Sequence, residues 1–420
     1  MGRGLVPGSG PEGYAAAIMV RRSVLALALA CALVPGCAIA PPGPVGAPYP
    51  TSPSPSVTVV PSPSVTPPPS PMPKPPPSAS ARPSPTPTPT PTGPPITGDD
   101  PVTLAFAGDI HFEEQLRPVA RRPDGLASLR PHLSAADVTV VNLETAITER
   151  GTPLAGKAFT FRAPASALGV LADAGVDVVS VANNHGVDFG DVGLSDTLAA
   201  KASAPVAVIG VGADADEAFA PATFEVDGVR VAILTAMNLN DETTARHSAG
   251  ASEPGVATML ADPSRMVAAV ERARAEHDVV VAFLHYGRER IECPEARERR
   301  AVELLQAAGA DAIVGGHSHR VQAGGWSGST YVNYGLGNFV WWRNAGASGN
   351  TGVLTIEVDK ERVRQRRAGG DAGALVVKET WVPFRVTSSG IPEPVGAATA
   401  AQRLAERDAL RGCSGLDAQP

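Results

Sequence analysis

Residues 102–111 read VTLAFAGDIH, an apolar run that changes after Gly108 into an acidic and an imidazole side chain. Runs of this kind alternate with amphipathic segments along the chain, which predicts a layered α/β domain with some antiparallel sheet. The expected strands are 102–107, 138–143, 176–182, 205–210, 224–226, 229–234, 279–284, 312–314, 331–333 and 353–358. The expected helices are 164–174, 193–202, 265–276 and 294–308. Asp227-Gly228 predicts a hairpin turn between two of these strands.

Polar side chains follow five of the predicted strands, at the point where each strand ends. The five clusters are Gly108-Asp109-Ile110-His111, Asn142-Leu143-Glu144, Asn183-Asn184-His185, His285-Tyr286-Gly287 and Gly315-Gly316-His317-Ser318-His319. In α/β sheets, ligands bind beyond the carboxyl ends of the strands. We therefore expect these carboxylate, amide and imidazole groups to meet at one edge of the fold.

Imidazole, carboxylate and amide groups together indicate a metal site. A single histidine after a strand is more often a structural hydrogen-bonding residue, but here five follow apolar runs. The other three, His132, His247 and His277, are expected in helices or loops facing solvent. His317 and His319 can converge if the backbone turns, as Gly315-Gly316 would allow. This donor set suits Zn, Mn, Fe or Co, and the absence of thiols argues against a structural zinc.

The N-terminus is typical of an export signal. Arg21 and Arg22 precede an apolar run that ends before Cys37, as in a bacterial lipoprotein signal spanning residues 1–37. Cleavage before Cys37 would leave that thiol to carry lipid and anchor the protein on the outer face of the cell membrane. Ordinary cleavage with an incidental cysteine is the alternative, and Met19 could be the true start.

A linker is predicted over residues 38–99. More than half of the 42 prolines lie in residues 41–95, alternating with Ser and Thr. Such a stretch cannot bury enough apolar surface to fold, and as polyproline II it would reach about 170 Å. One domain is expected over 100–390, followed by a C-terminal tail over 391–420. No apolar run after Gly98 is long enough to cross a membrane.

The net charge and the cysteines indicate which partners and which cellular compartment to expect. A formal net charge of −7 argues against a nucleic-acid partner, because nucleic-acid binding needs a basic face. Apart from Cys31 and Cys37 in the signal region, the chain contains only Cys293 and Cys413. An oxidising compartment would allow a disulfide between them, which we expect; two separate thiols are the alternative.

The motifs G-D-x-H, N-x-E, N-N-H, H-x-G, G-H-x-H and G-L-G-N-F resemble those of the capsule synthesis protein CapA family, also called the poly-γ-glutamate biosynthesis family. The resemblance covers roughly residues 102–342 and is closest at 181–185 and 334–339. The family is similar in turn to the calcineurin-like metallophosphoesterases. It therefore implies a four-layer α/β/β/α sandwich.

The resemblance also implies roles for individual residues around two divalent metal ions. One metal would be held by Asp109, His111 and His319, and the second by Asn184, His285 and His317. Glu144 would bridge the two metals, where metallophosphoesterases usually place an Asp, and His185 would act as general acid. Because a Glu is one methylene longer, the resemblance supports a metal site better than it supports phosphatase activity.

Substrate contacts are less strongly indicated. Arg288 could meet an anionic substrate, although a solvent-facing Arg is the more common situation. Asn338 could orient a ligand side chain or contact substrate. Trp341 and Trp342 could form a binding wall or pack in the core.

Two functions fit these observations. The first is a metal-dependent hydrolase outside the cytoplasm, acting on a phosphoester or an amide-linked polymer. The second is a non-catalytic factor that binds or exports an anionic polymer within a membrane capsule-synthesis complex. The complete ligand set together with His185 favours the enzyme.

Overall fold

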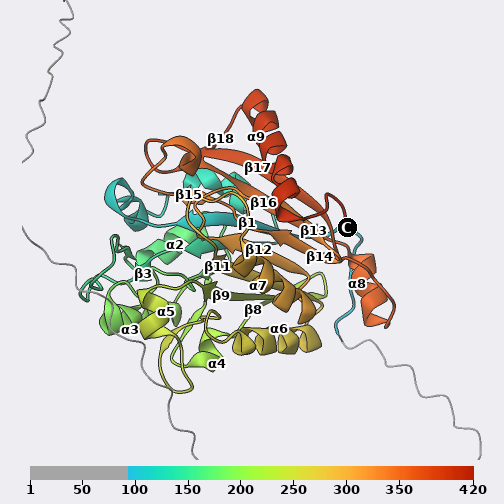
Figure 1. Cartoon of the computed structure of the whole chain (residues 1–420), viewed down its shortest axis with the longest axis horizontal. Helices are drawn as coiled ribbons and strands as arrows, with labels where there is room; N and C mark the ends of the chain where they lie inside the picture. The colour runs from blue at the N-terminus through green and yellow to red at the C-terminus, as the bar shows by residue number, and fades with distance from the viewer. Residues whose placement is uncertain (1–92) are drawn as a thin grey trace, which may run out of the picture. The chain divides into compact units, whose positions relative to one another are not determined.

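The computed structural model describes residues 93–420, so the predicted signal peptide, Cys37 and most of the predicted linker lie outside the described residues. Two mixed β-sheets form the centre of the domain (Figure 1). The first runs in the order β18 (Pro392–Pro394), β17 (Val376–Val386), β16 (Asn350–Val358), β1 (Val102–Ile110), β2 (Val138–Leu143), β5 (Val178–Ser180) and β6 (Ala207–Ile209), and β15 (Asn338–Val340) also pairs with β1. The second runs in the order β13 (Gly324–Ser327), β14 (Thr330–Asn333), β12 (Ala312–Gly316), β11 (Val279–Tyr286), β9 (Val229–Asn238) and β8 (Ala222–Val226).

Short pairs and helices complete the fold. The two-stranded pairs are β3 (Ala146–Ile147) with β4 (Arg162–Ala163), and β7 (Val211–Gly212) with β10 (Gly255–Val256). The helices are α1 (Arg130–Leu133), α2 (Ser166–Asp173), α3 (Gly190–Lys201), α4 (Ala215–Ala218), α5 (Glu242–His247), α6 (Ser264–Glu276), α7 (Ala296–Ala307), α8 (Lys360–Arg367), α9 (Ala397–Ala409) and α10 (Arg411–Ser414). None of the helices within residues 93–420 has the length and apolar character needed to span a membrane.

The sheets face each other because side chains alternate along each strand. Leu104 and Phe106 of β1 point to an inner core shared with the second sheet, where Phe106 and Phe283 lie with ring centroids 6.2 Å apart. Ala105 and Ala107 point the other way, into the cluster that contains the helices. The helices therefore cover the outer faces, and the predicted four-layer α/β/β/α arrangement is confirmed.

The expected elements are present, and most of them are longer than predicted, whereas β5, β6, α2 and α7 are shorter. The predicted hairpin at Asp227-Gly228 joins β8 and β9, with both residues at positive φ. The chain ends differ from the predicted domain limits. Residues 93–99 already contact the domain: Thr97 N–H donates to Asp227 O at 2.9 Å, and Arg367 donates to Pro94 O at 2.6 Å. The predicted linker thus extends about seven residues too far.

The predicted C-terminal tail is part of the domain. β18 pairs with β17, and α9 lies beside these two strands (Figure 1). The Arg407 side chain of α9 is 2% exposed and forms an ion pair with Glu379 at 2.7 Å. Cys293 and Cys413 form a disulfide that joins the segment after β11 to α10.

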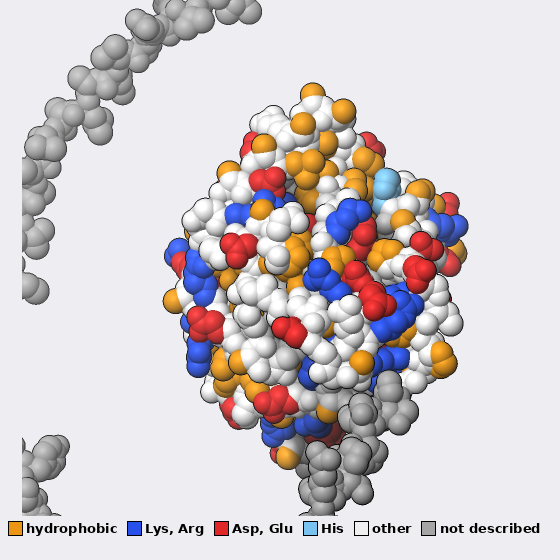
Figure 2. All heavy atoms as spheres, turned by 90° about the vertical axis from the view of Figure 1, so that its right-hand side faces the viewer, with side chains coloured by type: hydrophobic (Ala, Val, Ile, Leu, Met, Phe, Trp, Pro, Cys, Tyr) orange, Lys and Arg blue, Asp and Glu red, His pale blue; other side chains and the backbone are white. Residues whose placement is uncertain are grey.

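On the face seen in Figure 2, Lys and Arg side chains are interspersed with Asp and Glu.

A buried aspartate ties the start of β11 to α8 and β9. Burial alone would raise the pKa of Asp278, but hydrogen bonds from Arg367 and Arg230 outweigh it and lower the pKa to about 2. Because the folded pKa lies below the unfolded one, the ionised form contributes stability that is complete above about pH 4 and is lost as pH falls toward 2. We expect Asp278→Asn to reduce the free energy of unfolding by roughly 1–2 kcal/mol at neutral pH.

Urea denaturation across a series of pH values measures this effect, and the difference from the parent should shrink as the solution is acidified. Asp124→Asn is the matched control, because that carboxylate is 81% exposed. A loss of stability that is the same at every pH would contradict the electrostatic explanation.

Candidate metal centre

Both sheets deliver polar side chains to one place. β1, β2 and β5 run parallel in the first sheet, and β9, β11 and β12 run parallel in the second. Asp109 lies at the end of β1, and Glu144 directly follows β2, its N–H donating to Ile110 O at 2.7 Å. His285 and His317 come from the ends of β11 and β12. The predicted convergence of strand ends therefore occurs, and it joins the two sheets.

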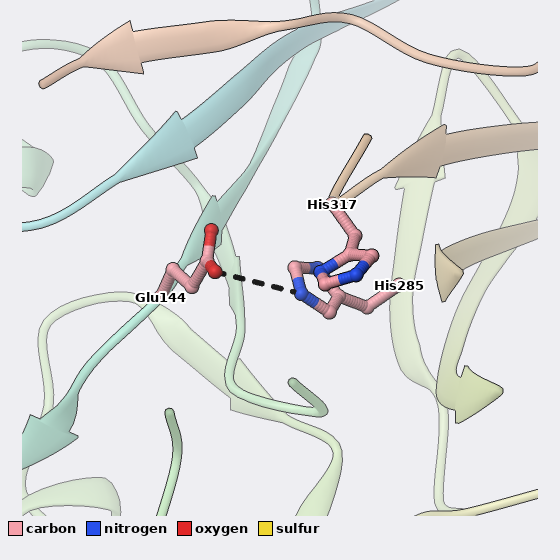
Figure 3. Close-up of side chains that lie close together, drawn as sticks. All are labelled: Glu144, His285 and His317. Atoms are coloured by element: carbon pink, nitrogen blue, oxygen red, sulfur yellow. Dashed lines mark ion pairs between the residues drawn. The ribbon is translucent and has the colours of Figure 1, made fainter. Parts of the chain in front are cut away.

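The donors form two groups that share one carboxylate. Glu144, His285 and His317 form one group, and Asp109, Glu144 and His319 form the other, with the ligand atoms of each group within 4.8 Å of one another. Figure 3 shows Glu144 pointing at the two imidazoles, with its Oε1 3.7 Å from His285 Nε2. Asp109 Oδ2 lies 3.3 Å from His319 Nδ1. Glu144 is the side chain that belongs to both groups.

Asn184 extends the first group. Its Oδ1 lies 2.8 Å from His285 Nε2. The two residues come from different sheets, because Asn184 follows β5 of the first sheet and His285 belongs to β11 of the second. Six side chains that the sequence predicts as metal ligands are therefore brought together. They are Asp109, Glu144, Asn184, His285, His317 and His319.

The donors fit divalent cations. Both carboxylate oxygens of Glu144 and Nδ1 of His317 and His319 are buried without a hydrogen-bond partner among the described residues. Burial, reinforced by the negative charge of Asp109, raises the pKa of Glu144 well above its usual value. Burial also lowers the pKa of His285 and His317, which favours the neutral imidazole that metal binding requires. Bound cations would compensate the buried carboxylates, which are otherwise costly.

An amide network holds the ligands in place. Asn142 Nδ2 donates to Asp109 Oδ1 at 2.8 Å and lies 3.1 Å from His285 Nδ1. Asn183 in turn donates to Asn142 Oδ1 at 3.0 Å. Outer hydrogen bonds of this kind orient metal ligands. Asn142 is thus a supporting residue that the sequence reading did not assign, although it lies in the N-x-E motif.

The turn at His317 and His319 forms differently from the expectation. The positive φ values fall on the histidines themselves, at 85° and 52°, and not on the glycines before them. Gly316 instead allows the backbone to lie close to the Asp109 carboxylate, because a Cβ at this position would lie 2.8 Å from Asp109 Oδ1. His317 N–H donates to Asp109 Oδ2 at 3.2 Å, which fixes the strained turn against the site.

His185 lies beside the donors with one ring nitrogen turned toward them. Its Nε2 is 3.8 Å from Glu144 Oε1, and its Nδ1 is 2.5 Å from Asp188 Oδ2. The fully buried Asp188 also accepts from Phe161 N–H at 2.7 Å and pairs with Lys157 at 2.6 Å. Burial lowers the pKa of His185, and the hydrogen bond to Asp188 opposes that effect. Asp188 therefore holds the imidazole in one orientation.

Neither Asp188 nor Lys157 was singled out in the sequence. Asp188 lies three residues after His185, a spacing that could have drawn attention to it. Lys157 belongs to no motif, yet its side chain is only 8% exposed, and its ammonium donates to Asn184 O. This lysine links the Asn184 backbone to Asp188, and so connects a metal donor to the residue that orients His185.

Replacing Asp188 by Asn tests this orienting contact. Without the carboxylate that selects one tautomer, we expect the ¹⁵N shifts of His185 to move from those of a single tautomer to those of a mixture. NMR spectra of the variant and the parent measure this change, which a merely structural role would not produce. Parent-like ¹⁵N shifts in the variant would contradict the role.

Three predicted site residues lie apart from the donor groups. The resemblance places His111 with Asp109 and His319, but the structure puts it outside both groups. Its ring packs between Phe161 and Trp341, at centroid distances of 4.5 and 4.2 Å, and its Nδ1 accepts from Glu113 N–H. The imidazole thus lies in an aromatic cluster beside the donors without belonging to either group.

Arg288 and Asn338 lie in two separate hollows beside the centre. Arg288 is exposed, pairs with Glu295 at 2.7 Å, and lines a polar hollow of about 680 Å³ next to Asn184 and His317. Asn338 is buried on β15 and donates to Ser348 O at 3.1 Å. It lines a smaller hollow that reaches His185 and His319.

The smaller hollow, of about 110 Å³, has an aromatic wall. We call it the aromatic hollow, and its remaining lining residues are Phe159, Phe161, Trp341, Trp342, Glu289, Arg290, Arg343 and Ser348. Both tryptophans line this hollow, and they also pack against the domain: Trp341 is buried and Trp342 is half-buried. Phe161 stacks on His185 with ring centroids 4.1 Å apart.

Comparison with known proteins identifies the class of this chain. Residues 103–341 match the family described as "Bacterial capsule synthesis protein PGA_cap", and the chain belongs to that family. The matched segment contains every donor residue of the centre. The family predicted from the strand-end motifs is therefore confirmed.

Individual relatives agree with this assignment. "PGA biosynthesis protein CapA" of Bacillus subtilis is 29% identical over 247 residues, which cover 58% of this chain and 64% of that protein. "Probable polyglutamine synthesis accessory protein MT0602" of Mycobacterium tuberculosis is 29% identical over 193 residues, covering 44% of this chain and 50% of that protein. The chain thus spans less than two thirds of these relatives.

Among solved structures, one described as a novel phosphatase from Mycoplasma pneumoniae aligns with a TM-score of 0.43 and 13% identity. The alignment covers 69% of this chain and 95% of that chain. The four-layer arrangement of the present protein follows from its own sheets and helices.

Proposed function

We propose that the chain is an extracytoplasmic, metal-dependent hydrolase of capsule or cell-envelope polymer synthesis, acting on a phosphoester or an amide-linked anionic polymer. The single observation that carries this proposal is the shared carboxylate: Glu144 belongs to both donor groups, and His185 faces it. Family membership and the name of the Bacillus relative support a role in poly-γ-glutamate synthesis.

The proposed cofactor is a pair of divalent ions, Mn, Fe, Zn or Co. Asp109 and His319 would hold one ion, His285, His317 and Asn184 the other, and Glu144 both. Such a pair supplies an activated water and a positive clamp on the substrate. Asn142 keeps Asp109 and His285 in place, while the buried surroundings exclude bulk water.

His185 is the proposed general acid. Its Nδ1–H donates to Asp188, so when the ring is doubly protonated its Nε2–H is the proton that it can give to a leaving group at the centre. A proton transfer of this kind typically contributes 10²–10⁴-fold. The aromatic hollow and the polar hollow on either side of the centre are the spaces in which the substrate would lie.

The proposal extends to the location of the protein. Lipid on Cys37 would anchor it to the outer face of the membrane, and residues 38–92 would separate the domain from the bilayer. A membrane capsule-synthesis complex is the partner we propose there. The disulfide between Cys293 and Cys413 supports an oxidising compartment.

A second candidate function is a non-catalytic factor that binds or exports an anionic polymer. The Mycobacterium relative, which is named an accessory protein, favours it.

Metal counting and a substrate screen separate the two candidates. The full chain, purified without chelators, should contain two metal ions and should hydrolyse a phosphodiester, a phosphomonoester or a γ-glutamyl polymer. Chelation should stop turnover, and added metal should restore it. Absence of bound metal would eliminate the enzyme, whereas two ions with polymer binding but no turnover would favour the second candidate.

A further inference from the structure

The aromatic hollow is lined by His185 and His319 together with side chains exposed to solvent, and we call this exposed part its opening. Arg290 and Arg343 are two of these exposed side chains. Neither side chain has a carboxylate partner among residues 93–420, and the one acidic side chain lining the hollow is Glu289. The hollow therefore carries a net positive charge beside a centre that can bind cations.

Both arginines are held at the opening by specific contacts. Arg343 lies over two aromatic rings, 4.9 Å from the Phe159 centroid and 4.6 Å from that of Trp342. Arg290 has a φ of 65°, unusual for a residue with a side chain, and its N–H donates to Ser318 O at 2.7 Å. Ser318 separates His317 from His319, so Arg290 is fixed directly to the turn that carries two metal donors.

The wall beside these charges is apolar. Phe159 is 45% exposed, although a large aromatic side chain is usually buried, and it packs edge-on against Trp342 at a centroid distance of 5.8 Å. A chain that carries carboxylates along an aliphatic backbone fits this combination, because the rings can cover its methylenes while a guanidinium binds the charge. A bare phosphate would use the charges but leave the apolar wall in water.

We propose that Arg290 and Arg343 are specificity-determining residues that bind the pendant carboxylates of an aliphatic polyanion entering the metal centre through the aromatic hollow. The proposal rests on the proposed function for the role of the metal centre. Recognition of the polymer, however, is a property of the opening and can be measured separately.

Calorimetric titration of the full chain with a short γ-linked glutamate oligomer tests this proposal. Arg290→Gln and Arg343→Gln should each weaken binding roughly fivefold, and the double variant about 20-fold, since each exposed charge contributes modestly. The losses should diminish at high salt. The uncharged amide counterpart of the oligomer should bind weakly to all proteins.

Arg272→Gln on α6 is the matched control, because it removes an equally exposed positive charge that does not line the hollow. Parent-like binding by the two hollow variants, or an equal loss in the control, would overturn the proposal. Metal content measured on the same samples distinguishes a failure of the proposed hydrolase function from a failure of the proposed specificity role. Protein without metal whose oligomer binding still depends on both arginines would refute the catalytic function and support the specificity site.

Discussion

Glu144→Gln is expected to reduce metal affinity at least about 100-fold at both donor groups, because an amide cannot supply the shared negative charge. The same substitution should leave the metal-free protein as stable as the parent, or more stable. In the parent, both Glu144 oxygens are buried without hydrogen bonds, and burial raises the pKa of this carboxyl group. A neutral amide is less costly at such a place than an ionised carboxylate.

Elemental analysis and thermal unfolding, with and without chelator, measure the two effects together. His319→Ala provides a comparison within the site, since this residue belongs to one donor group only, and it should impair that group alone. Glu379→Gln is the matched control. Its carboxylate pairs with the buried Arg407, so metal content should be retained while stability falls. Full metal occupancy in Glu144→Gln would refute the bridging role.

The convergence of the donors could be predicted because it follows from a general property of parallel sheets. Strands that run in the same direction end at the same edge, so the residues after them meet even when they are far apart in the chain. Asp109, Glu144, His285 and His317 all obey this rule. Their residue types in turn indicate metal chemistry.

What could not be predicted depends on packing between distant segments. His111 directly follows β1, as Glu144 follows β2, yet its ring packs between Phe161 and Trp341 and lies outside both groups. Lys157 is a loop residue, and only the fold shows that it is buried against Asp188. No periodic pattern in the sequence reports contacts of either kind.

The C-terminal part shows a second reason why its structure could not be predicted from the sequence. α9 has one buried residue, the charged Arg407, so burial of an apolar face is not what attaches this helix to the domain. Its attachment comes from ion pairs with Glu379 and from the disulfide at Cys413. Interactions between individual charged or sulfur-containing side chains depend on tertiary placement, which explains why this segment was predicted to be a tail.

His185→Gln is expected to lower turnover by about 10²–10⁴-fold while leaving both metals bound. The glutamine amide has no proton that it can release to a leaving group, whereas the donor groups do not include His185. The loss should depend on the leaving group. Esters of p-nitrophenol, which depart without protonation, should be hydrolysed almost as fast as by the parent, and alkyl esters or amides should show the full loss.

This dependence on the leaving group distinguishes proton donation from a structural effect. His277→Gln is the matched control, since that histidine lies at the end of α6, and only its Nδ1 contact with Ala273 O would be affected. If His185→Gln slowed all substrates equally with metal retained, His185 would be acting by positioning the substrate. Turnover equal to the parent on alkyl esters would show that the proton comes from another group, and the general-acid assignment would then be wrong.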